Sequence, residues 1–256
     1  HQEWWPASAS ELNELVTQEA ERPGLILGDG QHVRTATIGE HIFDVIRTSH
    51  CKRVISLDRE SKIVRAESGI TWGDLQAEMN ERGLSLERYR LYPQNSSIGG
   101  LLARHSSVGK ELWDGNLKSG CIALSSSSPT LSKYRYTAAP RKASGPDSRY
   151  LFIGGEGLLG AILDASLVVW KPSDARLFTW DISAVEAIDH YRTIHDLGVN
   201  ISWAHHAGTR FTVATHGPER LLKGIERELF AHLPGAEVGG RADVSTRRKE
   251  LETSHP

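Results

Sequence analysis

Apolar residues recur at spacings of three and four positions in four segments of the chain, which is the pattern of amphipathic helices. Three of these segments begin with a capping signal, because Ser8, Thr71 and Ser183 are each followed three positions later by an acidic residue. The fourth begins at Gly217-Pro218, where proline suits the first turn of a helix. The sequence therefore predicts four helices, one after each of these signals.

Shorter apolar runs between these helices have the composition of β-strands. Val54–Leu57 and Ile63–Ala66 are separated by turn residues and are predicted to pair. Ala161–Trp170 is apolar and β-branched enough to be a buried strand. In contrast, we expect Ser125–Ser128, followed by Pro129, to be a solvated hairpin loop.

The pattern changes after Lys171-Pro172. Strand Leu177–Ile182, the helix from Ser183, a hairpin and the helix from Gly217-Pro218 follow in the order β-α-β-β-α. The hairpin is expected to pair Ile201–Ala204 with Arg210–Ala214. This order predicts a split βαβ sheet covered on one face by two helices, with a weak last strand at 236–238.

These elements predict an α+β protein with two parts. We place the boundary at Pro172, which gives an N-terminal domain of residues 1–172 and a small ferredoxin-like cap of residues 173–256, complete or truncated. The chain begins at His1 rather than Met, so we treat it as a fragment or as a renumbered product.

Composition and charge narrow the function. A formal net charge of -2 gives no reason to expect a nucleic-acid partner. No apolar stretch approaches the roughly 20 residues that span a bilayer, and the first residues lack a signal-peptide layout. Cys51 and Cys121 are too few and too far apart for a disulfide framework or a thiolate metal site, so we expect two buried free thiols. We therefore expect a soluble, cytoplasmic protein without direct membrane insertion.

Three glycine-rich segments are candidates for binding a nucleotide. They are GDGQHV at 28–33, SIGGLLA at 97–103 and GGEGLLG at 154–160. Glycine lets backbone N–H groups approach a ligand because it has no Cβ. Each segment alone also fits an ordinary turn, but three in one chain exceed what turns require.

The order of these segments carries a resemblance. GDGQ, then VRAESGITWGDLQAEMNERGLSL, then YPQNSSIGGLLA, then RKASGPDSRYLFIGGEGLLGAILDASLVVWKP resembles the FAD-binding domain of the vanillyl-alcohol oxidase (PCMH) type. Within that superfamily the chain most resembles the FAD-binding subunit of glycolate oxidase. The resemblance covers roughly residues 5–172 and, more loosely, the cap to about residue 233.

The resemblance implies a set of FAD-binding positions. In the family the three segments lie against the diphosphate, the flavin and the adenosine, and Asp29 interrupts the first of them here. A carboxylate beside a diphosphate is unfavourable unless it points away or binds the ribose. The positions that match are Gly28, Asp29, Gly30, Gln31, His32, Pro93, Ser97, Ile98, Gly99, Gly100, Gly157, Gly160 and Ile162.

The resemblance also raises the question of covalent FAD. Some members attach FAD through a histidine at the fourth place of the first segment, which is Gln31 here, with His32 one residue late. Cys121 matches a second attachment site of doubly linked members, but a buried strand thiol is the simpler interpretation. We therefore expect non-covalent FAD. Arg141-Lys142 matches a basic pair of the family, with a role near the cofactor or on a solvated face.

The cap holds the candidate catalytic residues. His205, His206 and Arg210 are expected at or beside the hairpin tip, where Arg would bind a substrate carboxylate and His would accept a hydroxyl proton. An exposed polar turn explains the same residues. Adjacent strand residues point to opposite faces, so the two histidines are poor joint metal ligands and we predict no metal.

Three hypotheses follow for the function. The first is an FAD-dependent oxidoreductase, or its FAD-binding subunit, that takes a hydride from a 2-hydroxy acid or related alcohol. Its electrons would pass to an iron–sulfur or other acceptor subunit. The second is an inactive module on the same scaffold that binds a nucleotide or a protein. The third, a nucleotide-binding enzyme without flavin, lacks a phosphate-loop lysine signature and a GxGxxG after a strand.

Overall fold

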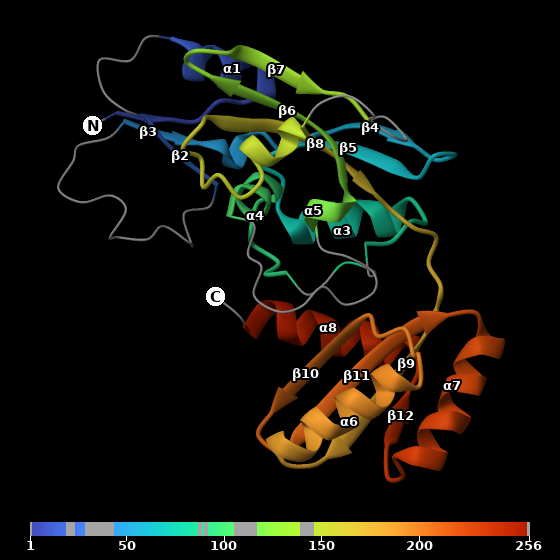
Figure 1. Ribbon diagram of the computed structural model, residues 1–256. Coiled ribbons are helices and arrows are strands. Elements are labelled where there is room, and N and C mark those ends of the chain that lie inside the picture. The colour runs from blue at the N-terminus through green and yellow to red at the C-terminus, as the bar shows by residue number, and fades with distance from the viewer. Residues whose placement is uncertain are drawn as a thin grey trace.

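The computed structural model describes residues 2–18, 24–28, 44–86, 89, 92–104, 117–138 and 146–254. Within these ranges the chain forms two regions, an N-terminal region up to residue 168 and a cap of residues 174–254 (Figure 1). The predicted boundary at Pro172 lies in the connection between the last strand of one and the first strand of the other.

A five-stranded antiparallel sheet organises the N-terminal region. Helices α3 (Trp72–Glu81), α4 (Ile98–Arg104) and α5 (Leu117–Gly120) lie along one face of it (Figure 1). Helix α1 (Ala9–Thr17) packs against β6 and β8 from the other side. The strand order is β4 (Val54–Asp58), β5 (Ile63–Glu67), β8 (Ala161–Val168), β6 (Cys121–Ser128) and β7 (Ser132–Tyr136).

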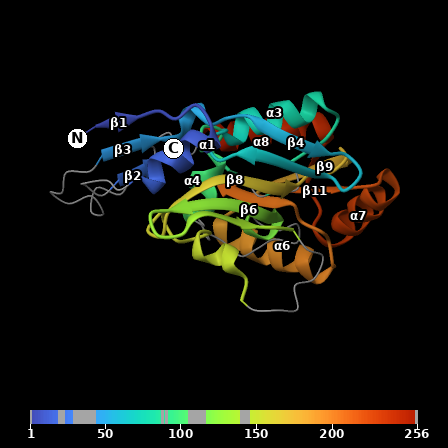
Figure 2. The ribbon, with the colours of Figure 1, turned by 90° about the horizontal axis from the view of Figure 1, so that it is seen from above.

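A second, smaller sheet lies beside α1, as the view from above shows (Figure 2). Its strands β1 (Glu3–Trp4), β3 (Asp44–Arg47) and β2 (Gly24–Leu27) are parallel and lie in that order. Short 3-10 turns follow at Thr48–His50 and at Ser148–Leu151. The region is thus divided into two subdomains, one around each sheet.

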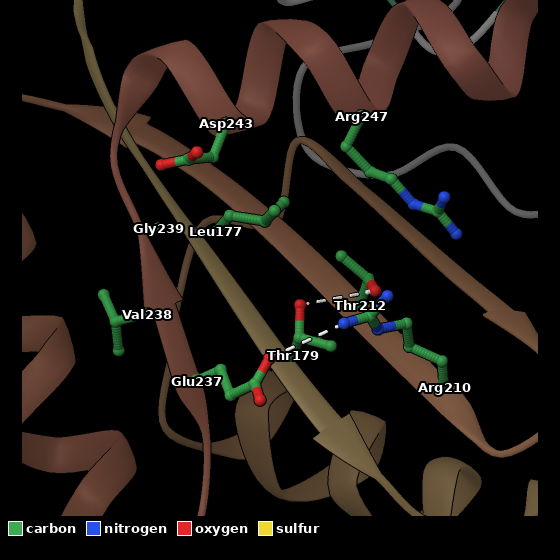
Figure 3. A pocket seen from close by; sticks show the side chains of 9 residues that line it. All are labelled: Leu177, Thr179, Arg210, Thr212, Glu237, Val238, Gly239, Asp243 and Arg247. Carbon is green, nitrogen blue, oxygen red and sulfur yellow. Dashed lines mark hydrogen bonds and ion pairs between the residues drawn. The ribbon is translucent and has the colours of Figure 1, made fainter.

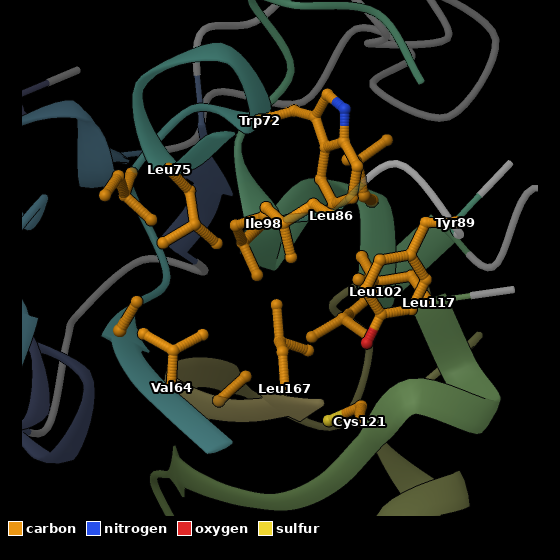
Figure 4. Close-up of a cluster of buried hydrophobic side chains, with 14 of the residues drawn as sticks. Val64, Trp72, Leu75, Leu86, Tyr89, Ile98, Leu102, Leu117, Cys121 and Leu167 are labelled. Atoms are coloured by element: carbon orange, nitrogen blue, oxygen red, sulfur yellow. The ribbon is translucent and has the colours of Figure 1, made fainter. Parts of the chain in front are cut away.

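The main core of the N-terminal region lies between the five-stranded sheet and its helices. Figure 4 shows Trp72 and Leu75 of α3, Ile98 and Leu102 of α4, and Leu167 of β8 packed into one cluster. All five side chains are at most 1% exposed. Burial of this apolar area holds α4 against the sheet, which fixes the place of the second glycine-rich segment.

The cap has the predicted ferredoxin-like order, with the weak last strand present. Its antiparallel sheet runs β10-β11-β9-β12, which places the first and third strands at the centre. Helices α6 and α7 cover one face through a cluster that includes Phe178, Trp180 and Phe211. The elements are β9 (Asp174–Asp181), α6 (Ala184–Asp196), β10 (Trp203–Ala207), β11 (Arg210–Gly217), α7 (Glu219–His232) and β12 (Glu237–Gly239).

A further helix, α8 (Arg241–Ser254), covers the other face of the cap sheet. Its buried residues Val244 and Leu251 pack with Leu177 and Trp203. Figure 1 shows α8 between the cap sheet and the N-terminal region. No helix in the described ranges is long and apolar enough to cross a membrane.

The capping signals are confirmed as helix starts. The hydroxyls of Ser8 and Thr71 accept from the N–H groups of Glu11 (3.3 Å) and Asp74 (3.1 Å). Ser183 and Glu186 form a full capping box at α6, and α7 begins directly after Pro218. Local hydrogen bonding therefore decides where these helices begin.

The expectation for Ser125–Ser128 is wrong. These four serines belong to β6, and each is at most 3% exposed. Strand β6 lies between β7 and β8, and Ser128 starts the turn instead, where its Oγ accepts from the N–H of Leu131 (3.0 Å). Small hydroxyl side chains fit where α1 packs closely on β6, so composition alone was misleading.

Candidate functional site

Gly28, the described residue of the first glycine-rich segment, meets the second segment at the end of β2. Gly28 follows β2 directly, and a Cβ at this position would overlap Oγ of Ser97. Ser97 in turn directly precedes α4. A close approach of the Ser97 side chain to the backbone therefore explains glycine at 28, and it places Gly28 beside a segment that is far away in the sequence.

The amides of the second segment are used inside the protein. The N–H groups of Ile98 and Gly99 donate to the carbonyl oxygens of Ile70 (2.9 Å) and Ser68 (2.7 Å). The N–H of Gly100 donates to Oγ of Ser97 (3.2 Å). Because this oxygen acts as the acceptor, the hydroxyl proton of Ser97 is directed elsewhere and is the group here that suits an anionic ligand.

The third segment joins the other end of α4. The N–H groups of Gly154 and Glu156 donate to the carbonyl oxygens of Leu102 (3.0 Å) and Ala103 (2.9 Å), which α4 leaves unpaired at its C-terminus. Gly28 and the second and third glycine-rich segments therefore converge on α4.

Gly160 occupies the most demanding backbone position of the third segment. Its φ is +134°, and a Cβ there would overlap the carbonyl oxygen of Ser127. Gly157 also has a positive φ, +79°, but open space around it. Glycine at 160 is thus required twice, by conformation and by contact.

Of the remaining predicted cofactor residues, the structure describes Pro93 and Ile162. Pro93 lies in the loop before α4, where its carbonyl accepts from the N–H of Ser96 (3.1 Å). Ile162 is 6% exposed and packs in the main core, so its backbone rather than its side chain is available for a ligand. Outside the described residues lie Asp29, Gly30, Gln31, His32 and the pair Arg141-Lys142.

Three buried serine hydroxyls next to these segments have no hydrogen-bond partner within the described parts of the chain: Ser68, Ser126 and Ser127. Ser68 lies against Gly99, since a Cβ at 99 would come within 2.7 Å of its Cβ. Ser127 approaches Gly160 with its backbone carbonyl and not with its hydroxyl. A buried hydroxyl without a partner is costly, so Ser68 beside Gly99 offers a donor to a further polar group.

The cap contains a groove of about 300 Å³ between α8 and strands β9, β11 and β12 (Figure 3). Arg210 and Arg247 lie on one side of it, and Glu237 and Asp243 on the other. The hydroxyls of Thr179 and Thr212 face each other at its floor (3.5 Å). The volume and the charged side chains suit a small polar molecule.

The charged groups of this groove already have partners. Arg210 pairs with Glu237 across 3.6 Å, and both side chains are more than half exposed. Arg247 pairs with Glu250 (2.9 Å), and Asp243 accepts from the N–H of Gly240 (2.7 Å) at the start of α8. We refer to this site as the cap groove.

The structure corrects the placement of the two histidines. His205 and His206 lie within β10, paired with Thr212 and Phe211, and only Arg210 starts the strand after the turn. His206 donates from Nε2 to the carbonyl oxygen of Ile182 (3.2 Å). His205 shares a sheet face with Trp203, the α8 side, so it lies on the face of the cap groove, whereas His206 does not.

The sequence did not reveal the contribution of α8 to this groove. Arg247 and Asp243 lie in a charged segment whose described buried apolar residues are Val244 and Leu251. Their spacing of seven is a helical signal, but two residues are too few to stand out. The described residues contain no group of three or more His, Cys, Asp or Glu that could hold a metal ion.

Both cysteines are buried thiols. Cys51 donates to the carbonyl oxygen of Pro6 (3.1 Å), and Cys121 to that of Ala123 (3.4 Å). Burial raises the pKa of each thiol to about 12. A protonated, buried thiol is a poor nucleophile, so Cys121 is unsuited to covalent attachment of a cofactor.

Comparison with known proteins agrees with this arrangement. Residues 4–126 match the family of FAD binding domains. The chain is similar to alkyldihydroxyacetonephosphate synthase of Caenorhabditis elegans, with 25% identity over 126 residues, 49% of this chain and 21% of that protein. It is also similar to mitochondrial D-lactate dehydrogenase [cytochrome] of Arabidopsis thaliana, with 29% identity over 171 residues, 65% of this chain and 30% of that protein.

A third relative is the uncharacterized FAD-linked oxidoreductase YgcU of Escherichia coli, with 25% identity over 50% of this chain and 26% of that protein. Among solved structures, one of alkyldihydroxyacetonephosphate synthase has a TM-score of 0.78 at 17% identity, covering 98% of this chain and 56% of the other. That likeness shows the fold, and it extends over the cap. The chain spans less than a third of the curated relatives that it matches.

Residues 4–126 are therefore similar to FAD binding domains, and this similarity together with the FAD-linked relative supports FAD as the cofactor. The residues present fit the cofactor, because the glycine-rich segments bring backbone and small hydroxyls together around α4 with little side-chain bulk. Ser97 and Ser68 would supply hydroxyl donors. The positive φ of Gly157 and Gly160 keeps the turn before β8 close to the rest of the site.

Proposed function

We propose that the chain is the FAD-binding part of an FAD-dependent oxidoreductase that acts on the CH–OH group of a 2-hydroxy acid or related alcohol. The observation that carries this proposal is the convergence of Gly28 and two further glycine-rich segments on α4, in a region that matches the FAD binding domain model over residues 4–126. Bound FAD supplies a two-electron acceptor. The chain's own residues then have to bind the acid and remove a proton.

The cap groove supports an acidic substrate. Arg210 and Arg247 lie on the same side of it, and an arginine fork binds a carboxylate through two parallel hydrogen bonds. Glu237 is 80% exposed and holds Arg210 at 3.6 Å, so a substrate carboxylate would replace it at little cost. The hydroxyls of Thr179 and Thr212 would bind other polar atoms of the substrate.

His205 is the better candidate for accepting the hydroxyl proton. It is paired in register with Thr212, which lines the groove, and it lies on the same sheet face. His206 is directed to the opposite face and bonds to Ile182. The proposal thus keeps Arg210 and His205 from the sequence analysis, adds Arg247 and removes His206 from the catalytic set.

Electrons would leave through a partner, such as an iron–sulfur or other acceptor subunit, as the resemblance to the FAD-binding subunit of glycolate oxidase implies. The Arabidopsis relative supports a separate acceptor, because its name specifies a cytochrome, and it supports a hydroxy acid as donor. The Caenorhabditis elegans relative is named a synthase, so the names of the relatives divide between two reactions.

The test is anaerobic reduction of the FAD-loaded protein by a panel of 2-hydroxy acids and matched alcohols without the carboxylate. We expect the visible flavin band to bleach with at least one acid. Arg210→Met should raise the acid concentration for half-maximal bleaching roughly tenfold or more, because a charged hydrogen bond is lost. Arg227→Met, on the exposed surface of α7 away from the groove, is the matched control.

Bleaching by the alcohols and acids alike, unaffected by Arg210→Met, would contradict the role of the groove. A stable flavin band that no member of the panel bleaches would contradict the oxidoreductase and favour an inactive binding module.

A further inference from the structure

Helix α8 is held on the cap sheet by its apolar side chains. Val244 and Leu251 are 1% and 4% exposed and pack with Leu177, Trp203 and other residues of the sheet. These two residues lie seven positions apart, which places them on one side of the helix. The helix therefore moves with the cap.

The same helix also reaches the N-terminal region through Arg248. This arginine is 1% exposed, and its Nη1 donates to the carbonyl oxygen of Tyr89 at 2.9 Å, across 159 positions of the sequence. Burying a guanidinium is costly unless its donors are bonded. A fully buried arginine between two regions therefore marks a specific contact.

Tyr89, which accepts this hydrogen bond, is held firmly in place by its surroundings. Its side chain is fully buried in the main core, where Figure 4 shows it in the same cluster as Trp72. Its ring centroid lies 5.6 Å from that of Trp72 and 4.9 Å from that of Trp170. Its hydroxyl donates to the carbonyl oxygen of Val168 (2.9 Å). Val168 ends β8, and Trp170 lies in the connection to the cap, so Arg248 is bonded to the residue against which this connection packs.

Helix α8 also forms one wall of the cap groove. Asp243 and Arg247 both line it, and they precede Arg248 by five positions and by one position. A displacement of α8 from the N-terminal region would therefore move this wall together with the sheet.

We propose that Arg248 is a positioning residue that holds the cap, and with it the cap groove, in a fixed orientation over the FAD-binding region. The relevance to substrate rests on the function proposed above. The coupling between cofactor and cap does not, because it requires only that FAD binds the N-terminal region and that Arg248 joins the two regions.

The test is hydrogen–deuterium exchange of α8, measured by mass spectrometry on the whole chain with and without saturating FAD. The variants are Arg248→Met, Arg248→Lys and the control Lys249→Met, which removes an exposed cation from the adjacent position of the same helix. Wild type and Lys249→Met should show slower exchange in α8 when FAD is bound. Arg248→Met should exchange roughly tenfold faster there, as expected for loss of a charged hydrogen bond, and should lose the response to FAD.

Arg248→Lys should recover part of the response, because an ammonium group still donates to a carbonyl. Equal exchange in Arg248→Met and Lys249→Met would overturn the proposal. If Arg248→Met fails to fold, the wild-type protein alone tests the proposal. Exchange in wild-type α8 that FAD leaves unchanged would then overturn the proposal.

A kinetic readout separates this proposal from the proposed function. With a bleaching acid, Arg248→Met should raise KM more than it lowers kcat and leave FAD retention unchanged, because orientation rather than chemistry is altered. If no acid bleaches the flavin, the proposed function fails while the exchange experiment still tests Arg248.

Discussion

The two regions of the molecule build their candidate sites from different materials. Around α4 the groups that meet are backbone and small residues, with Gly28 against Ser97 and Gly160 against Ser127. In the cap groove they are long side chains, Arg210 from the sheet and Arg247 from α8. The first kind of site constrains which residues fit the backbone, whereas the second tolerates many sequences that bring the same charges together.

This difference decides what can be recognised in a sequence. A glycine segment is visible because few other residues fit a positive φ or a close backbone contact. An arginine on a strand has the same appearance whether it faces a ligand or water.

The largest expected effect concerns the backbone-built site. Gly160→Ala should weaken FAD binding by an order of magnitude or more, since φ of +134° strains a residue with a Cβ by about 1–3 kcal/mol and the Cβ also overlaps Ser127. The measurement is quenching of flavin fluorescence on titration.

The cap offers the matching control. Gly224 lies inside α7 with open space around its Cβ position, so Gly224→Ala should raise the stability of the cap by up to about 1 kcal/mol without changing FAD affinity. Equal FAD affinity of Gly160→Ala and Gly224→Ala would contradict the view that FAD binding depends on the backbone-built site.

The next effect concerns a carboxylate that ties α1 to the five-stranded sheet of the N-terminal region. Glu67 is 1% exposed and accepts from the N–H groups of Ala9 (3.1 Å) and Arg53 (2.9 Å) and from the Arg53 guanidinium (2.9 Å). Burial by itself raises the pKa of Glu67, but these hydrogen bonds outweigh it and hold the pKa below its ordinary value.

A lowered pKa in the folded state means that ionised Glu67 stabilises the fold above the ordinary carboxyl pKa and that this stability is lost as the pH falls through the folded value. Glu67→Gln should lower the free energy of unfolding by about 1–3 kcal/mol at pH 7. The gap to wild type should close in acid. Denaturant titrations at a series of pH values measure it, with Glu60→Gln in an exposed turn as control; a gap independent of pH would contradict the role of the charge.

A smaller effect is expected in the cap. Ser183→Ala removes the capping box of α6, in which the Ser183 hydroxyl accepts from the N–H of Glu186 and the Glu186 carboxylate from that of Ser183. The cap should lose about 1 kcal/mol of stability. Faster amide exchange confined to α6 would support this, and exchange that also accelerates in α3 would show that the regions unfold as one unit.

The smallest effect is an expected lack of reaction. Both cysteines of the sequence belong to the N-terminal region, and burial raises their pKa to about 12. An aromatic disulfide reagent at pH 8 should therefore react with native protein only as fast as this region opens. Glu67→Gln should accelerate the reaction and Ser183→Ala should not, so thiol release distinguishes opening of one region from opening of the other.

The sequence predicted the elements whose signals are local. Ser8, Thr71 and Ser183 cap helices through bonds to residues three positions on, and the weak strand at Ala236–Val238 exists as β12. Ser125–Ser128 was misjudged because burial of a serine run depends on α1, far away in the chain.

The candidate sites divide in the same way. The described glycines of the predicted site lie around α4. They could be predicted because a positive φ or a close contact restricts these positions to glycine. Helix α8 and Arg247 were missed because their place depends on packing against a sheet that begins some 70 residues earlier. Position on a face, rather than residue type, makes Arg247 relevant.

The central pairing of the N-terminal sheet also bears on how the chain is made. Strand β5 ends at Glu67 and pairs with β8, whose partner residue for Glu67 is Asp164, so this sheet cannot close until residue 164 has left the ribosome. The cap sheet, in contrast, uses only residues 174–239, and its most distant partner residues, Leu177 and Gly239, lie 62 positions apart. Short closures form faster than long ones, so the cap, though synthesised after the N-terminal region, is expected to fold in the shorter time once it emerges. A nascent chain stopped before β8 would display an unpaired edge of β5, which marks the stage of synthesis most exposed to aggregation.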